Sequence, residues 1–182
     1  MNVLHQQGDI LIRTAELADA DQIAEVAAHT YTVTFGDSMT PEDLADVLQT
    51  TRSAPVFRQH IRDGSDLLVA CMGERIVGYI LVVDNMLHTQ CCSAGDRCIK
   101  SVYVHPDAQG KGIGRALMVA SLERPGCKAA KAVYLDVWEE NRKAVSLYKS
   151  LGFVPAGTVP VMARGVQIGE DMILRKSMET NS

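Results

Sequence analysis

The sequence lacks several features that would place the protein in well-known classes. Its 182 residues contain no apolar run near the length of a membrane span. The N-terminal segment, residues 1–8, has no signal-peptide core, so we expect a cytoplasmic protein without a membrane partner. Lys and Arg number 18 against 22 Asp and Glu, a formal net charge of −4. This balance argues against nucleic acid as a partner.

The five cysteines do not form a recognisable framework, because their number is odd and no Cys-x-x-Cys pair occurs. Cys91 and Cys92 are adjacent, and we expect them to lie as reduced thiols in a loop. Structural zinc sites usually show ligands paired two to four residues apart in two clusters. The scattered residues His88, Cys98 and His105 do not meet that pattern, so we predict no metal.

Internal repeats, linkers and low-complexity segments are also absent from the sequence. The length suits one domain with a sizeable core. Hydrophobic residues make up 47% and charged residues 22%, an ordinary globular balance. We predict one domain over residues 9–177, with tails at 1–8 and 178–182.

What the sequence does contain is a glycine-rich turn, Gln109–Arg115, between a strand-like and a helix-like run. The strand is predicted at Cys98–Val104, and Ile113, Ala116, Leu117 and Ala120 recur with helical spacing. The first N–H groups of a helix have no partner within it and carry the positive end of its dipole. Glycines let a phosphate approach such a backbone, and Lys111 and Arg115 add charge.

Two well-known glycine motifs do not fit this turn. A dinucleotide fingerprint, Gly-x-Gly-x-x-Gly, fails because counting from Gly110 the last position is Arg115. A P-loop fails because no lysine followed by Ser or Thr is present in the turn. An ordinary strand-to-helix turn, with glycines for tight packing, remains the alternative.

A second strand-helix unit follows. Val133–Trp138 alternates and is rich in β-formers. Asn141 is a good helix N-cap, and Gly152 stands where a helix commonly ends. Asn141, Ala144 and Tyr148 have the spacing of one helix face.

Together the two units resemble the GNAT superfamily of N-acetyltransferases. Residues 109–114 match its pyrophosphate-binding signature, Arg/Gln-x-x-Gly-x-Gly/Ala, and residues 141–153 match Asn-x-x-Ala-x-x-Leu-Tyr-x-x-x-Gly-Phe. The resemblance is good from Arg97 to Arg175. It implies a single α/β (α+β) domain. In such a domain a mixed, mostly antiparallel, twisted sheet of six to seven strands is flanked by about four helices. The expected strands are Asp9–Arg13, Asp66–Cys71, Arg75–Val83, Cys98–Val104, Val133–Trp138, Val154–Met162 and Gln167–Leu174; the expected helices are Asp19–Tyr31, one starting after the N-cap Thr40, Val56–Arg62, one from Ile113 and one from Asn141.

The same resemblance implies the site. In this family the strands before the two signatures splay apart, and the pantetheine arm of coenzyme A fills the gap. It would pair with the backbone of Val102, Tyr103 and Val104. Asn141 and Tyr148 would reach the cofactor from the second helix. The pyrophosphate would lie on Gln109, Gly110, Lys111, Gly112, Ile113, Gly114 and Arg115.

Tyr148 matches the family position that hydrogen-bonds the thioester sulfur. A thiol has a pKa of about 8.5 and a phenol about 10, so full proton transfer to the thiolate is uphill by roughly 2 kcal/mol. We therefore expect Tyr148 to act mainly as a hydrogen-bond donor to the developing charge. A tyrosine packed in the core is the alternative.

No general base is evident, since Cys98–Val104 contains no carboxylate. Four residues are candidates: Glu25, His29, Asp136 and Glu139. A water chain to bulk solvent, or direct binding of the neutral amine, serves equally well.

The acceptor is expected to be a primary amine of a small molecule or a peptide. Tyr31, Phe35 and Trp138 are aromatic candidates for its binding, or plain core residues. A looser resemblance to bacterial polyamine acetyltransferases favours a polyamine-like amine, and a homodimer is compatible with it. The predicted function is acetyl transfer from acetyl-CoA by direct attack in a ternary complex. An acyl-CoA sensor without turnover is the alternative.

Overall fold

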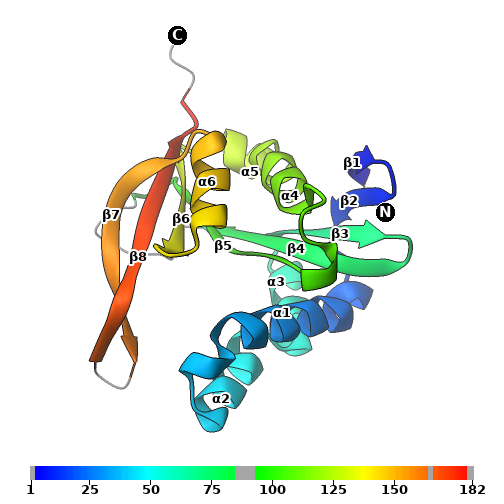
Figure 1. Cartoon of the computed structure of the whole chain (residues 1–182). Coiled ribbons are helices and arrows are strands. Elements are labelled where there is room, and N and C mark those ends of the chain that lie inside the picture. The colour runs from blue at the N-terminus through cyan, green and yellow to red at the C-terminus, as the bar shows by residue number, and fades with distance from the viewer. Residues whose placement is uncertain (1–2, 85–92, 164–165, 180–182) are drawn as a thin grey trace. The chain divides into compact units, whose positions relative to one another are not determined.

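A computed structural model describes residues 3–84, 93–163 and 166–179 (Figure 1). The predictions made for His88, Cys91 and Cys92 concern residues outside the described ranges. The strands are β1 (Val3–Gln7), β2 (Ile10–Thr14), β3 (Asp66–Met72), β4 (Arg75–Asp84), β5 (Arg97–Val104), β6 (Ala132–Trp138), β7 (Val154–Ala163) and β8 (Val166–Ser177). The α-helices are α1 (Ala20–Phe35), α2 (Pro41–Thr51), α3 (Ala54–Arg62), α4 (Ile113–Leu122), α5 (Pro125–Lys128) and α6 (Arg142–Ser150); single 3-10 turns are η1 (Leu17–Asp19), η2 (Gly36–Ser38) and η3 (Pro106–Ala108).

Within these ranges, hydrogen bonds join eight strands in the order β1-β2-β3-β4-β5-β6-β8-β7. The pairs β2–β3 and β6–β8 are antiparallel and β5–β6 is parallel, so the mixed α/β architecture is confirmed. The sheet has one strand more than the six to seven predicted. The additional strand is β1, in a segment predicted to be a tail. It pairs with β2 alone, and its mostly polar side chains give no apolar alternation to detect.

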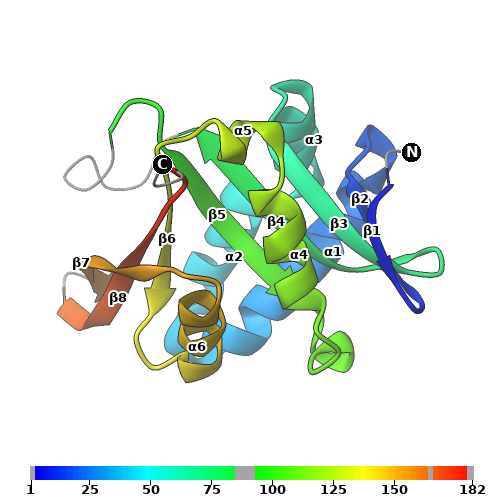
Figure 2. The same cartoon turned by 90° about the horizontal axis from the view of Figure 1, so that it is seen from above.

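The residues group into two compact units, which share β4 and β5. The first comprises Met1–Leu81 and Ser101–Ser121. Figures 1 and 2 show α1 and α3 on one face of its sheet and α4 on the other. Alternation along β4 explains both contacts. Tyr79 meets Phe57 of α3, with ring centroids 5.2 Å apart, while the neighbouring Gly78 faces Leu117 of α4.

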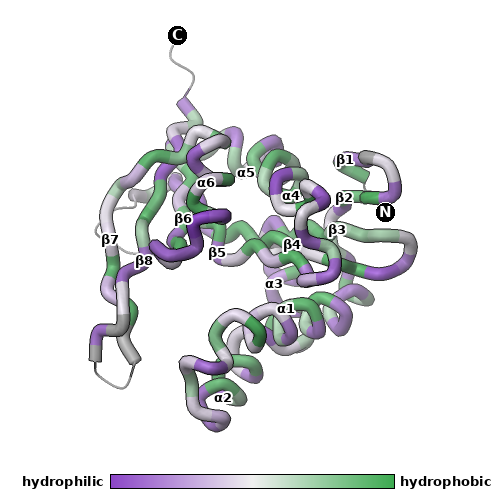
Figure 3. Tube along the Cα trace, viewed as in Figure 1, coloured by the Kyte–Doolittle hydropathy of each residue, from purple (hydrophilic) through white to green (hydrophobic). Residues whose placement is uncertain are grey.

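Helix α1 buries one stripe of small and branched side chains. Ile23, Val26 and Ala27 are buried, as the spacing predicted, and the tube in Figure 3 alternates between hydrophobic and hydrophilic along this helix. Helix α2 begins as predicted too. The hydroxyl of Thr40 accepts a hydrogen bond from the N–H of Asp43 at 3.1 Å.

A partly buried ion pair fixes the entry to α1. The Nη1 and Nη2 atoms of Arg13 donate to Asp19, at 2.6 and 2.8 Å, and the N–H of Glu16 donates to the same carboxylate. Burial alone would raise the pKa of Asp19. The hydrogen bonds from Arg13 and Glu16 outweigh it and hold that pKa below its ordinary value.

The second unit comprises Val82–Lys100 and Leu122–Ser182. Here β5 runs parallel to β6, with Arg97 opposite Val133 and Cys98 opposite Tyr134. Strands β7 and β8 form a long antiparallel pair, and β8 also pairs with β6. The ammonium of Lys176 in β8 donates to the carbonyl of Leu151 at 2.9 Å, which ties the end of α6 to the sheet. Helix α5 was not predicted, because its single turn is too short to show a period.

Candidate active site

The glycine-rich turn is exposed and firmly anchored at both ends. It lies between the 3-10 turn η3 and helix α4, with Gln109, Gly110, Lys111 and Gly112 all exposed. The next residue, Ile113, is only 1% exposed, and Ala108 before the turn is 3% exposed. The backbone of the turn is thus presented to solvent while its flanks are held in the core.

Two glycines give the turn its shape. Gly110 and Gly112 both have φ of 78°, a conformation that residues with a Cβ rarely adopt. A Cβ built on either one meets nothing within 4 Å, so the glycines are not there to avoid a protein neighbour. They turn the backbone and leave open space over it. The carbonyl of Gly112 accepts from the N–H of Ala116 at 3.0 Å, which starts α4 directly at the turn.

This arrangement fits a phosphate group. The first N–H groups of α4 have no partner within the helix, and the space in front of the glycines is where an anion would approach. The side chains of Lys111 and Arg115 are exposed beside it. The observation that carries the fit is the open space over Gly110 and Gly112, which we call the cradle. A Cβ at either glycine would fill it.

The side chain of Gln109 has a bracing role. Its amide nitrogen donates to the carbonyl of Val104 at 3.1 Å, across η3. The N–H of His105 donates to the carbonyl of Val77 in β4 at 2.8 Å. Gln109 therefore ties the turn to the end of β5, which is itself tied to β4.

Strand β5 presents different residues on its two faces. Val102, Tyr103 and Val104 are half-buried. A Cβ on Gly78 would lie 2.9 Å from the carbonyl oxygen of Tyr103 and 3.4 Å from both Val104 and Leu117 of α4. The ring of Tyr103 lies instead 5.9 Å from that of Tyr79, on the face covered by α1 and α3.

On that face an arginine lies against Tyr31, one of the predicted aromatic residues, and against Tyr103. The guanidinium carbon of Arg52, which follows α2, lies 3.8 Å from the ring centroid of Tyr31 and 5.8 Å from that of Tyr103. Phe35 extends the group, with its ring 4.8 Å from Tyr31. Burial raises the pKa of the Tyr31 hydroxyl, and the positive charge of Arg52 opposes that rise. Nothing local in the sequence marks Arg52 as a member of this group.

Two of the four candidate bases share a cavity of about 240 Å³. Its lining includes Glu25, His29, Arg75 and His105. The imidazole rings of His29 and His105 are stacked, with centroids 4.7 Å apart and planes 9° apart. Arg75 approaches the Nε2 atom of His105 at 3.4 Å. His105 directly follows β5 and was not among the four bases predicted from the sequence.

The second signature unit places its two matching residues on α6. Asn141 caps the helix, with its side-chain oxygen accepting from the N–H of Ala144 at 3.2 Å. Tyr148 is 7% exposed, and its ring lies 6.1 Å from that of Phe153. The chain turns at Gly152, where φ is 86°. The predicted cap and helix end are confirmed.

The remaining predicted residues lie on β6 and just after it. The ring of Trp138 packs on Gly169 of β8, so closely that a Cβ on that glycine would come within 2.2 Å of the ring. Asp136 is half-buried within β6. Glu139 is exposed, and its N–H donates to the carbonyl of Glu170 at 3.3 Å.

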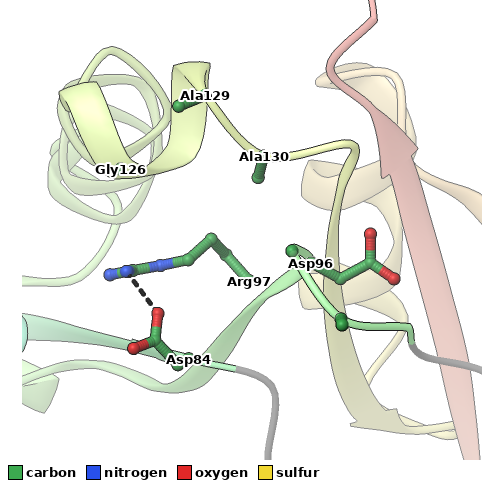
Figure 4. Close-up of a pocket in the computed structure, with 8 residues that line it drawn as sticks. Asp84, Asp96, Arg97, Gly126, Ala129 and Ala130 are labelled. Carbon is green, nitrogen blue, oxygen red and sulfur yellow. Dashed lines mark hydrogen bonds and ion pairs between the residues drawn. The ribbon is translucent and has the colours of Figure 1, made fainter.

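A larger cavity, of about 560 Å³, lies in the second unit. Figure 4 shows residues that line it. Arg97 pairs there with Asp84 at 2.7 Å, and small residues of α5 and the segment after it complete the wall. The carboxylate of Asp96 accepts from the N–H of Ser93 at 2.7 Å. The acidic side chains of this cavity are thus engaged within the protein.

Among residues 3–84, 93–163 and 166–179, no group of three or more His, Cys, Asp or Glu side chains is arranged to hold a metal. Across the same ranges, no helix has the length and apolarity needed to cross a membrane.

Comparison with known proteins agrees with this architecture. The protein YncA of Salmonella typhimurium, solved with acetyl-CoA, superposes with a TM-score of 0.72 at 21% identity. The match covers 96% of this chain and 97% of that one. At this identity the likeness shows the fold alone.

Two curated relatives are similar over most of their length. An uncharacterized N-acetyltransferase of Mycobacterium tuberculosis is 29% identical over 145 residues, covering 78% of this chain and 87% of its own. The L-amino acid N-acyltransferase MnaT of Escherichia coli is 28% identical over 160 residues, covering 82% of each. The model of the acetyltransferase (GNAT) family matches residues 21–153. The chain therefore belongs to the acetyltransferase (GNAT) family and is an acyltransferase enzyme.

Proposed function

We propose that this enzyme transfers an acetyl group from acetyl-CoA to the primary amine of a small molecule or a peptide, by direct attack in a ternary complex. The observation that carries the proposal is the open glycine cradle at the start of α4, with Gly110 and Gly112 both at φ of 78°. It suits the pyrophosphate of coenzyme A. Membership of the GNAT family also supports acetyl-CoA as the acetyl donor.

Each part of the chain has a proposed task. The N–H groups of residues 109–115 bind the pyrophosphate, while Lys111 and Arg115 add positive charge at its sides. The backbone of Val102, Tyr103 and Val104 orients the pantetheine arm. Acetyl-CoA, when bound, supplies an acyl group activated as a thioester. Tyr148 donates a hydrogen bond where negative charge develops on sulfur, and Asn141 supports the cofactor from α6.

The proposal extends to the acceptor side. Tyr31, Phe35 and Trp138 are proposed to line the acceptor site, and polyamines remain in the set of amines to test because of the subgroup resemblance. We also propose that the enzyme is a homodimer, and analytical sedimentation, which measures the mass of the particle in solution, tests this.

A thiol-release assay tests the function directly. With acetyl-CoA and a panel of polyamines, amino acids, aminoglycosides and peptides, we expect amine-dependent release of free coenzyme A. Mass spectrometry of the product should show one added acetyl group. Saturable binding of acetyl-CoA without thiol release from any amine would instead identify an acyl-CoA sensor.

A further prediction concerns how the attacking amine loses its proton. Because β5 carries no carboxylate, we expect the rate to rise with pH along the titration of the substrate amine itself. Replacing Glu25, His29, Asp136 or Glu139 singly should cost less than the roughly hundredfold typical of losing a committed general base. The pH profile should also shift when a less basic amine is used. A fixed profile that collapses on one of these replacements would show a dedicated base.

A further inference from the structure

Arg52 is a half-buried arginine whose described contacts are with hydroxyl groups and aromatic rings. Its Nη1 atom donates to the hydroxyl of Thr51 at 2.6 Å, and its Nη2 atom lies 3.4 Å from the hydroxyl of Tyr103. The Nε atom is buried and has no hydrogen-bond partner. Within the part of the chain that the structure describes, no carboxylate forms an ion pair with Arg52.

Part of this side chain is held out of water without an acceptor. Arg52 is half-buried as a residue, but its buried Nε–H has no acceptor, which costs free energy. The faces of Tyr31 and Tyr103 offset part of it through cation–π contact, at 3.8 and 5.8 Å. Beyond the N–H groups that donate to Thr51 and Tyr103, Nη1 and Nη2 each carry a second N–H, and two such groups can bind a carboxylate in bidentate fashion.

The position of Arg52 separates it from the phosphate cradle. The ring of its partner Tyr103 lies near that of Tyr79, which contacts Phe57 of α3, and so lies on the face of the first unit that α3 covers. The cradle stands at the start of α4, which covers the opposite face through Leu117. The residues on either side of Tyr103, Val102 and Val104, are those whose backbone we assign to the pantetheine arm. An anion on Arg52 would therefore lie beside the reacting end of the cofactor and away from its pyrophosphate.

We propose that Arg52 binds the carboxylate of the acceptor, so that the acceptor is an amino acid or another small amine bearing a carboxylate near its amino group. This inference rests on the proposed acetyl transfer. A guanidinium at this place repels the additional ammonium groups of a polyamine and attracts a carboxylate. Tyr31 acts in the site by contacting the guanidinium with its ring. The naming of the Escherichia coli relative as an L-amino acid N-acyltransferase is in keeping with this class of acceptor.

The experiment compares amino acids with their carboxamides, for example L-methionine with L-methioninamide, in the thiol-release assay. Rates are expressed per neutral amine, because an amide lowers the pKa of its amino group. The native enzyme should favour the acid in kcat/KM. Arg52→Met should lose roughly tenfold to hundredfold toward the acid, mostly in KM, and little toward the amide. Arg52→Lys keeps the charge but cannot donate two parallel hydrogen bonds to a carboxylate. Its preference for the acid over the amide should therefore lie between those of the native enzyme and Arg52→Met.

Arg58→Met is the matched control, since Arg58 pairs with Asp21 on the same unit away from the aromatic group. It should leave the acid-to-amide ratio unchanged. A purely structural role for Arg52 would lower activity toward acid and amide equally, together with Tm, and would overturn the inference. If Arg52→Met does not fold, Arg52→Lys and Arg52→Gln give the same comparison.

The two proposals fail in different ways. Thiol release with polyamines and none with carboxylate-bearing amines would overturn the role of Arg52 and leave acetyl transfer intact. Absence of thiol release from every amine would contradict acetyl transfer. In that case the shift in Tm of the coenzyme A complex on adding the acid, compared with the amide, still decides whether Arg52 binds a carboxylate. A shift specific to the acid and lost in Arg52→Met supports the binding role, and equal shifts overturn it.

Discussion

Replacing Gly112 with valine is expected to weaken the binding of coenzyme A by at least about tenfold, measured by calorimetry. Gly112 has φ of 78°, where a β-branched residue is strained. Its added Cβ would also project into open space, since no protein atom lies within 4 Å of that position. Because we assign this space to the pyrophosphate, the valine both distorts the N–H groups and obstructs the anion.

Gly73→Val provides the control for backbone strain. Gly73 lies in the turn between β3 and β4, also has positive φ, 61°, and its Cβ would likewise meet nothing within 4 Å. Gly73→Val should therefore lower Tm by a similar amount while coenzyme A binds normally. Unchanged affinity in Gly112→Val, or an equal loss in Gly73→Val, would contradict the assignment of the cradle.

Local patterns predicted much of this fold because the physics behind them is local. The N-caps Thr40 and Asn141 use their own side chains to satisfy N–H groups three residues on, as their sequence context indicated. The buried stripe of α1 follows from helical spacing. The positive φ of Gly112 and Gly152 follows from what glycine alone adopts readily.

The parts that escaped prediction depend on residues far apart in the chain. Arg52 meets Tyr31 and Tyr103 only because α1, α2 and β5 come together, and no spacing in the sequence encodes that contact. The stacking of His29 on His105 has the same origin. The side-chain contact of Gln109 is a further example. The motif marks the residue, but only the structure shows its side chain bonded to the carbonyl of Val104.

Replacing Tyr148 with phenylalanine is expected to lower kcat by roughly tenfold to hundredfold, at or below the range for losing one oxyanion-hole donor. The ring is 7% exposed and packs near Phe153, so phenylalanine keeps the packing and removes only the hydroxyl. A hydrogen bond that strengthens as charge develops on sulfur affects the transition state more than the bound substrate. The KM for acetyl-CoA should therefore change much less than kcat.

The measurement must be made where chemistry limits the rate, which single-turnover kinetics establishes. Tyr134→Phe is the matched control. Tyr134 is another buried tyrosine of the second unit, and its hydroxyl accepts from Nε of Arg175 at 3.1 Å, so its removal tests the general effect of losing a buried hydroxyl. We expect Tyr134→Phe to lower Tm and leave kcat nearly unchanged, whereas Tyr148→Phe should lower kcat. If Tyr148→Phe retains the native kcat in single turnovers, Tyr148 serves the packing of α6, and the charge on the leaving sulfur must be stabilised by another group.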